Sequence, residues 1–278
     1  MSKFAGASWS IDDIPYGQLA AERVRDNRQL FEILASASFI EITSDLYTTN
    51  LVEFFRDDRE VAGWLEHRWE KEELQHGAAL KKYVQTAWPE FDWEAGYRIF
   101  LADYGPLCTV GRLARSRALE MTSRCVVETG TACFYRMLSE LSSEPVLTRL
   151  AAAISTDEVR HYKHFHRYFR RYRDVEQPSR LAVLRTLLNR AADVESEDTF
   201  YAFKAVFAAS HPGAVFERSD YDAYRDGVLH LVRHHFPHAM AVKMLLKPLG
   251  LSPRVGRATL PAVTSVTRLF LRRYDRAA

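Results

Sequence analysis

The chain has 278 residues, of which 47% are hydrophobic and 12% aromatic, so it can bury a large core as one domain or as a domain with an extension. Its 38 Lys and Arg nearly balance 36 Asp and Glu, which argues against nucleic acid or a membrane surface as the principal partner. The sequence contains no apolar stretch near the roughly 20 residues that span a bilayer, and no signal-peptide centre. We therefore expect no membrane span and a cytoplasmic location.

Two long helical tracts are predicted in the first third of the chain. The first runs from about residue 14 to 55, and its apolar and small residues converge on the face that carries Glu41. The second runs from about residue 61 to 86 and ends before Pro89. The segment 87–112 contains prolines and glycines, and is predicted to be a long connection with a short helix over WEAGYRIFLADY.

Two more long helices are predicted over residues 113–142 and 145–172, with SSEP as the turn and Pro145 at a first helical position. Two helix pairs joined by one long crossover predict an all-α four-helix bundle. We expect the bundle to occupy residues 1–175. Residues 176–278 are expected to form additional C-terminal helices that pack against it, over LAVLRTLLNRAADV, EDTFYAFKAVFAAS and DAYRDGVLHLVRHHF.

The four predicted bundle helices carry a repeated pattern of acidic and imidazole side chains. Each helix pair has a Glu on its first helix and Glu-x-x-His on its second, in the residues Glu41, Glu73, His76, Glu128, Glu158 and His161. Corresponding acids lie 87 and 85 residues apart, as two related helix pairs would give. Because residues i and i+3 share one face of a helix, the carboxylate and the imidazole of each Glu-x-x-His pair can bind the same ion.

Electrostatics favours a site with two bound metal ions over a metal-free cluster of buried carboxylates. Four carboxylates in a low-dielectric bundle repel one another, and each unpaired buried charge costs several kcal/mol, whereas two divalent cations cancel the charge. Carboxylate with imidazole favours iron, with manganese as the alternative, and the lack of thiolate ligands argues against structural zinc. Cys108, Cys125 and Cys133 form no CxxC pair and are predicted to be reduced thiols. Either Glu-x-x-His pair alone could instead be a charged surface feature, since composition predicts about one such pair by chance.

The motifs EELQHG and DEVRHY, each with a lone helical Glu upstream, resemble those of the ferritin-like dimetal carboxylate proteins. Within that superfamily they are most similar to the soluble acyl-carrier-protein desaturases and related diiron oxygenases. The resemblance covers roughly residues 28–172 and implies a ferritin-like bundle that holds two Fe ions. It further implies Glu73 and Glu158 as bridging carboxylates, with Glu41 and Glu128 as terminal ligands.

The resemblance also implies roles for residues beside the ligands. Glu72 and Asp157 match acidic positions that accept a hydrogen bond from an imidazole of the opposing helix pair; the alternative is two ordinary exposed acids. Thr131, one turn after Glu128, matches a hydroxyl residue on the oxygen-binding side and is the predicted catalytic residue; the alternative is a threonine bonded only to its own backbone. Gly130 costs about 1 kcal/mol in a helix, which predicts close packing or a local distortion there.

The predicted function is that of an oxygen-dependent diiron oxidase or oxygenase, of the hydroxylase, desaturase or N-oxygenase type. Its expected substrate is a small organic or carrier-bound acyl molecule. Because the chain shows no glycine-rich nucleotide-binding loop, we expect an external ferredoxin or reductase to supply electrons, and we expect a homodimer. A ferroxidase, a manganese catalase and a metal-free helical interaction module remain alternatives; the long segment after residue 175 disfavours the ferroxidase.

The C-terminal segment adds two further features. His230, His234, His235 and His238 lack a carboxylate at ligand spacing, and are predicted to be partly solvated rather than a second metal site. The tail is basic and is predicted to be a solvated helix end, with docking of an acidic carrier protein or ferredoxin as the alternative. Its arginines are Arg254, Arg257, Arg268, Arg272, Arg273 and Arg276.

Overall fold

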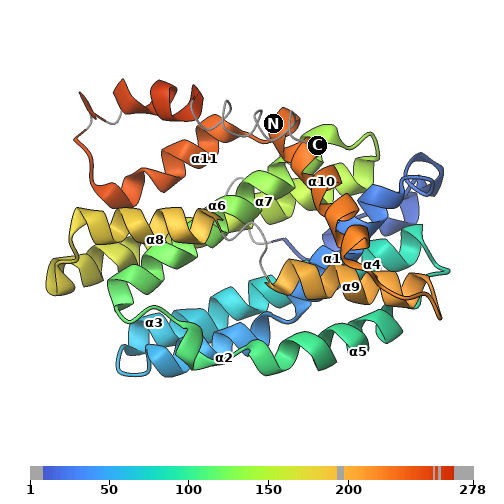
Figure 1. Ribbon diagram of the computed structural model, residues 1–278, viewed down its shortest axis with the longest axis horizontal. Helices are drawn as coiled ribbons and strands as arrows, with labels where there is room; N and C mark the ends of the chain where they lie inside the picture. The colour runs from blue at the N-terminus through green and yellow to red at the C-terminus, as the bar shows by residue number, and fades with distance from the viewer. Residues whose placement is uncertain (1–8, 193–196, 253, 256–257, 266–278) are drawn as a thin grey trace. The chain divides into compact units, whose positions relative to one another are not determined.

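The computed structural model describes residues 9–192, 197–252, 254–255 and 258–265 (Figure 1). Over these residues the chain is all-α and contains no β-strand, as predicted. None of the described helices combines the length and the apolar character needed to cross a bilayer.

Contacts divide the chain into two compact units. Unit 1 comprises Met1–Leu113, Ser142–Ala153 and Glu195–Val228, and unit 2 comprises Ala114–Leu141, Ile154–Val194 and Leu229–Ala278. The predicted division into a bundle up to residue 175 and an extension after it stays a prediction.

Unit 1 consists of α-helices with short turns before and between them. Its helices are α1 (Arg28–Ile42), α2 (Ser44–Phe54), α3 (Arg59–Trp64), α4 (Glu70–Ala87), α5 (Trp93–Tyr104) and α9 (Glu197–Ser210). Its short turns are η1 (Ile11–Asp13), η2 (Tyr16–Gln18), η3 (Ala21–Arg23), η4 (Leu65–Trp69), η5 (Gly105–Leu107) and η6 (Val110–Arg112). The bounds of α5 are those predicted for WEAGYRIFLADY, and α9 coincides with EDTFYAFKAVFAAS.

The continuous helix predicted over residues 14–55 is wrong, because the chain breaks it at Thr43. The Thr43 backbone leaves helical geometry (φ −98°, ψ 9°), and its N–H group bonds the Ile40 carbonyl oxygen (3.2 Å) where α1 ends and α2 begins. The second predicted tract is interrupted as well, since η4 is a π-helical turn between α3 and α4. Such a turn inserts extra backbone and resets which residues of α4 face α1.

Two close approaches organise the core of unit 1. Helices α1 and α4 lie side by side (Figure 1), and a Cβ added at Gly77 of α4 would overlap the Ile42 backbone of α1, with only 2.5 Å to the Ile42 Cα. The Phe39 ring of α1 packs on Trp93 and Phe100 of α5, at centroid distances of 5.1 and 5.9 Å. Glycine at position 77 therefore allows the backbone contact that brings Glu41 and His76 into one cluster.

Unit 2 contains α6 (Arg117–Leu141), α8 (Arg180–Ala192) and α11 (His238–Leu245), followed by the turn η7 (Lys247–Leu249). Helix α7 (Pro145–Glu176) begins at Pro145 as predicted, and α7 and α10 (Arg218–His235) each contribute residues to both units. The carboxylate at the end of α7, on Glu176, accepts hydrogen bonds from the backbone N–H groups of Arg117 (3.1 Å) and Ala118 (2.9 Å). These donors would otherwise lack partners at the start of α6, so Glu176, which lies beyond the end predicted for α7 at residue 172, caps α6.

The predicted C-terminal helices are present as α8, α9 and α10. Of the basic tail, only Arg254 belongs to the described residues, and it is exposed. The other predicted tail arginines lie outside the described residues: Arg257, Arg268, Arg272, Arg273 and Arg276.

Candidate metal centre

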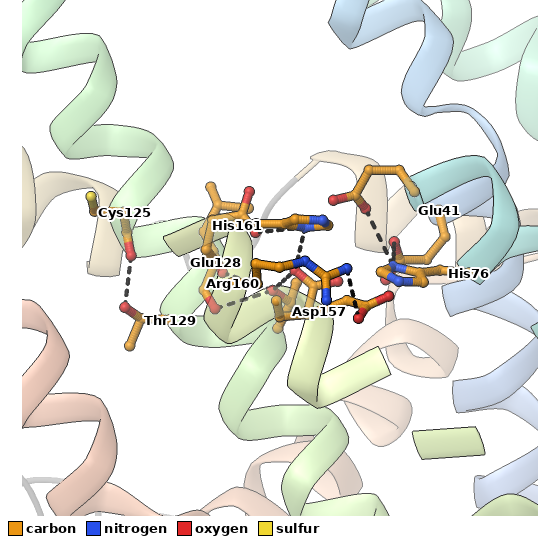
Figure 2. A network of polar contacts seen from close by, with 12 residues as sticks. Glu41, His76, Cys125, Glu128, Thr129, Asp157, Arg160 and His161 are labelled. Carbon is orange, nitrogen blue, oxygen red and sulfur yellow. Dashed lines mark hydrogen bonds and ion pairs between the residues drawn. The ribbon is translucent and has the colours of Figure 1, made fainter. Parts of the chain in front are cut away.

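Unit 1 gathers three of the predicted ligands into one group, which we call the Glu41 cluster: Glu41 from α1 with Glu73 and His76 from α4. The Nδ1 atom of His76 lies 4.0 Å from Glu41 Oε2 and 3.8 Å from Glu73 Oε2. Glu41 and Glu73 are 8% and 6% exposed, and His76 is fully buried. Figure 2 shows the Glu41 carboxylate directed toward the His76 ring.

The N-terminal segment covers the imidazole of this cluster. The Trp9 ring lies parallel to the His76 ring, with an interplanar angle of 1° and a centroid distance of 6.1 Å. Two hydrogen bonds hold the segment on α4: the Gln75 amide donates to the Trp9 carbonyl oxygen (3.1 Å), and the Tyr16 hydroxyl donates to the Ala79 carbonyl oxygen (2.9 Å). Sequence reasoning missed Trp9, because no periodic pattern in this segment points to α4.

Unit 2 gathers the other three predicted ligands, which we call the Glu128 cluster: Glu128 from α6 with Glu158 and His161 from α7. The Nδ1 atom of His161 lies 3.5 Å from Glu128 Oε2 and 3.7 Å from Glu158 Oε2. All three side chains are 1% exposed. Figure 2 shows Glu128 beside the His161 ring, in the arrangement that Glu41 and His76 adopt.

Thr131 joins the Glu128 cluster through its hydroxyl, which lies 2.9 Å from Glu158 Oε2 and donates to it. The same hydroxyl lies 3.3 Å from the Val127 carbonyl oxygen and 3.4 Å from that of Glu128. Thr131 therefore bonds its own helix backbone, as the alternative prediction had it, in addition to Glu158. Thr129 behaves differently, because its hydroxyl donates to the Cys125 carbonyl oxygen (2.7 Å; Figure 2). Of these two threonines in α6, Thr131 is the one whose hydroxyl bonds a predicted ligand.

The spacing of the donor atoms fits one cation in each cluster. Ligand atoms that share one ion at bond lengths near 2.1 Å lie at most about 4.2 Å apart, and the imidazole–carboxylate distances of 3.5–4.0 Å fall inside this limit. In each cluster the donor atoms of the three residues all lie within 4.8 Å of one another. Two carboxylates and one neutral imidazole carry two negative charges, which one divalent ion would cancel.

A thiol stands near the Glu128 cluster without belonging to it. Burial raises the pKa of Cys125 well above its usual value, and the Glu128 charge raises it further. The thiol is therefore protonated near neutral pH and does not compete as a thiolate ligand. The donor set is therefore oxygen and imidazole in both clusters.

The two predicted outer acids each form an ion pair with an arginine three or four positions away in the chain. The Arg68 Nε lies 2.6 Å from Glu72 Oε1, and an Arg160 Nη2 lies 2.9 Å from Asp157 Oδ1 (Figure 2). Asp157 is 2% exposed, so the alternative of two ordinary exposed acids is wrong for it. The predicted bond from each acid to an imidazole of the other helix pair stays a prediction.

The structure also tests the predictions made for Gly130 and for the histidines of the C-terminal segment. Close packing at Gly130 is wrong: the residue is exposed, α6 continues through it, and a Cβ added there meets nothing within 4 Å. The histidines of the C-terminal segment are split, with His230, His234 and His235 exposed and His238 only 5% exposed.

Comparisons with protein families, with curated proteins and with solved structures find no match to this chain.

Proposed function

We propose that the Glu41 and Glu128 clusters each bind a divalent metal ion, and that the two ions act as a pair in an oxygen-dependent oxidoreductase. The observation that carries this proposal is the matched geometry of the clusters. In both, a Glu of one helix and Glu-x-x-His of the next direct two carboxylates toward an imidazole Nδ1 at 3.5–4.0 Å. A surface charge pattern would not bury six such side chains to 8% exposure or less.

The residues present fit iron, with manganese as the second choice. Four carboxylates balance two divalent charges, and two imidazoles complete a donor set without thiolate. Bound as a pair, iron ions would supply the activation of O2, with electrons from an external ferredoxin or reductase. The proposed substrate is a small organic or carrier-bound acyl molecule, as the resemblance of the motifs implies.

The chain's own residues would hold and shield this site. The Thr131 hydroxyl fixes one oxygen of the Glu158 carboxylate and keeps an exchangeable proton 2.9 Å from it. Trp9 covers the face of the His76 ring, and both clusters are shielded from water by their burial. A buried, preorganised set of charged groups costs little reorganisation when substrate binds.

Metal content is the first test. The full-length chain, expressed with iron and separately with manganese, should contain two ions per chain by elemental analysis. Zero ions per chain would refute the proposal. A single ion, or two ions without magnetic coupling in electron paramagnetic resonance, would refute the pairing.

Reaction with O2 is the second test. Anaerobic protein loaded with two Fe(II) per chain should consume O2 once and then stop, and a bound organic substrate should accelerate the decay of the absorption that develops. Continued oxidation of many added Fe(II) ions per chain would instead identify an iron-handling protein. Rapid disproportionation of hydrogen peroxide by the manganese form would identify a catalase.

A further inference from the structure

Helix α8 is apolar on two faces. Val183 and Leu187 are 2% and 5% exposed, whereas Leu181, Leu184 and Leu188 are 54%, 38% and 60% exposed. The exposed leucines are spaced i, i+3 and i+7, so they form one continuous line along the helix, which we call the α8 stripe. A surface helix normally confines its apolar residues to the core-facing side, so a second apolar face indicates a partner.

Arginines border the α8 stripe. Arg180 and Arg185 are exposed, and at about 100° per residue they fall on opposite sides of the three leucines. Their long apolar stems can lie along the leucines while the guanidinium groups reach outward. Leucines bordered by arginines are typical of helices that lie in the headgroup region of an anionic membrane.

The near-neutral charge of the whole chain conceals two oppositely charged units. The segments of unit 2 contain 22 Lys and Arg against nine Asp and Glu, whereas those of unit 1 contain 16 against 27. Unit 2 also has a hollow of about 520 Å³ along α7, lined by Lys163, His166, Arg167, Arg170, Arg171 and Asp174. The balance of charges that argues against a membrane surface for the whole chain therefore does not hold for unit 2.

We propose that the α8 stripe docks unit 2 on an anionic lipid surface. The leucines would enter the boundary between headgroups and acyl chains, and Arg180 and Arg185 would pair with lipid phosphates. A second copy of the chain fits less well, because face-to-face α8 stripes would bring arginines against arginines. A zwitterionic bilayer carries no net negative surface potential to attract the arginines, because each of its phosphates is balanced by a choline.

Co-sedimentation of the full-length chain with vesicles tests this docking. We expect binding to vesicles of mixed phosphatidylcholine and phosphatidylglycerol and none to phosphatidylcholine alone. Raising the salt from about 0.1 M to about 1 M should release the protein, since the Debye length falls from ~10 to ~3 Å. The double variant Arg180→Gln/Arg185→Gln should lower the partition coefficient about 30-fold, and Leu188→Ser about tenfold.

Matched variants on unit 1 serve as controls. Arg59→Gln/Arg98→Gln removes the same charge from exposed positions, and Val215→Ser removes an 80% exposed apolar side chain. Both should bind vesicles like the unaltered chain. Equal loss in the controls, or equal binding to neutral vesicles, would overturn the proposal. A dimer in sedimentation velocity that Leu188→Ser dissociates, without vesicle binding, would overturn it in favour of a second copy. Binding of soluble polyglutamate without vesicle binding would overturn it in favour of an acidic protein.

Discussion

The Glu41 and Glu128 clusters have the same ligand types but different surroundings. The His161 Nδ1 atom lies 3.5 Å from the carboxylate of the neighbouring helix, against 4.0 Å for His76, and the Glu128 cluster is the more completely buried. An indole ring covers the first cluster, whereas a threonine hydroxyl bonds the second. Helical spacing therefore determines the donor types, whereas the residues around the donors differ between the two clusters.

The glycines beside the clusters differ as well. Gly77, next to His76, permits backbone contact with α1, whereas Gly130, two residues after Glu128, faces open space. One glycine is thus required for packing and the other is not, although both lie inside a continuous helix that carries ligands.

Removal of Glu128 should give the largest effect. With metal at about 100 times its dissociation constant, the unaltered chain should gain ~2.7 kcal/mol in unfolding free energy over the metal-free form. Glu128→Ala should lose this gain together with its bound metal, because one imidazole and one carboxylate cannot hold the ion. Elemental analysis and urea unfolding with and without Fe(II) measure both quantities.

Glu120 of the same helix is the matched control. Its carboxylate is 2% exposed, lies 2.9 Å from Arg124 Nε and accepts from the Ala114 N–H group (2.8 Å). Glu120→Ala should therefore destabilise the metal-free and loaded forms alike, by about 3–5 kcal/mol. If Glu128→Ala behaved like Glu120→Ala, with metal content intact, Glu128 would not be a ligand.

Alanine at the two glycines should act in opposite directions. Gly77→Ala should lower the unfolding free energy by about 3 kcal/mol, because backbone rather than a flexible side chain occupies the space. Gly130→Ala should raise it by up to about 1 kcal/mol through helix propensity alone. Thermal and urea unfolding check both, and equal effects of the two changes would contradict the packing described for α1 and α4.

A smaller effect is expected at Thr131. Thr131→Val removes the hydrogen bond to Glu158 at nearly constant volume, and should cost about 1–2 kcal/mol and weaken metal binding roughly tenfold. Thr131→Ser should restore most of both. If the serine variant remained as weak as the valine variant in metal titrations, the hydroxyl would not be the group that matters.

The smallest expected difference between the two units is in the rate at which their thiols react. Burial raises the pKa of Cys108, raises that of Cys133 to about 12, and raises that of Cys125 well above its usual value. A raised pKa leaves less thiolate near pH 8, so the half-buried Cys108 of unit 1 should react slowly with a disulfide reagent, and faster as pH rises. The two buried thiols of unit 2 should react only after denaturation. Rapid labelling of all three in the folded protein would contradict their burial.

Helical periodicity was enough to predict the all-α fold and the bounds of α5 and α9, and Asp92 marks the start of α5 because its side chain accepts a hydrogen bond from the Ala95 N–H group. It could not predict the break at Thr43, because nothing in the local sequence distinguishes this residue from a threonine inside a continuous helix, such as Thr129. The π-helical turn before α4 also escaped prediction, since its residues favour an ordinary helix and only tertiary packing distinguishes the two.

The six proposed ligands could be predicted because i and i+3 positions share a helix face whatever surrounds them. The position of Trp9 beside the Glu41 cluster could not be predicted, because its contact with His76 joins residues far apart in the sequence. The prediction of close packing at Gly130 failed for a related reason. A glycine in a helix can mark close packing, as Gly77 does, but the sequence does not show which residues of other helices lie against it.

The position of Trp9 bears on how the protein should be purified. The Trp9 ring lies parallel to the His76 ring at a centroid distance of 6.1 Å, so a segment fused close to Trp9 starts beside the Glu41 cluster. An oligohistidine affinity tag placed there would bring extra imidazoles near the proposed ligands and compete with them for ions. Stoichiometries should therefore be measured on untagged material, or after the fusion has been cleaved.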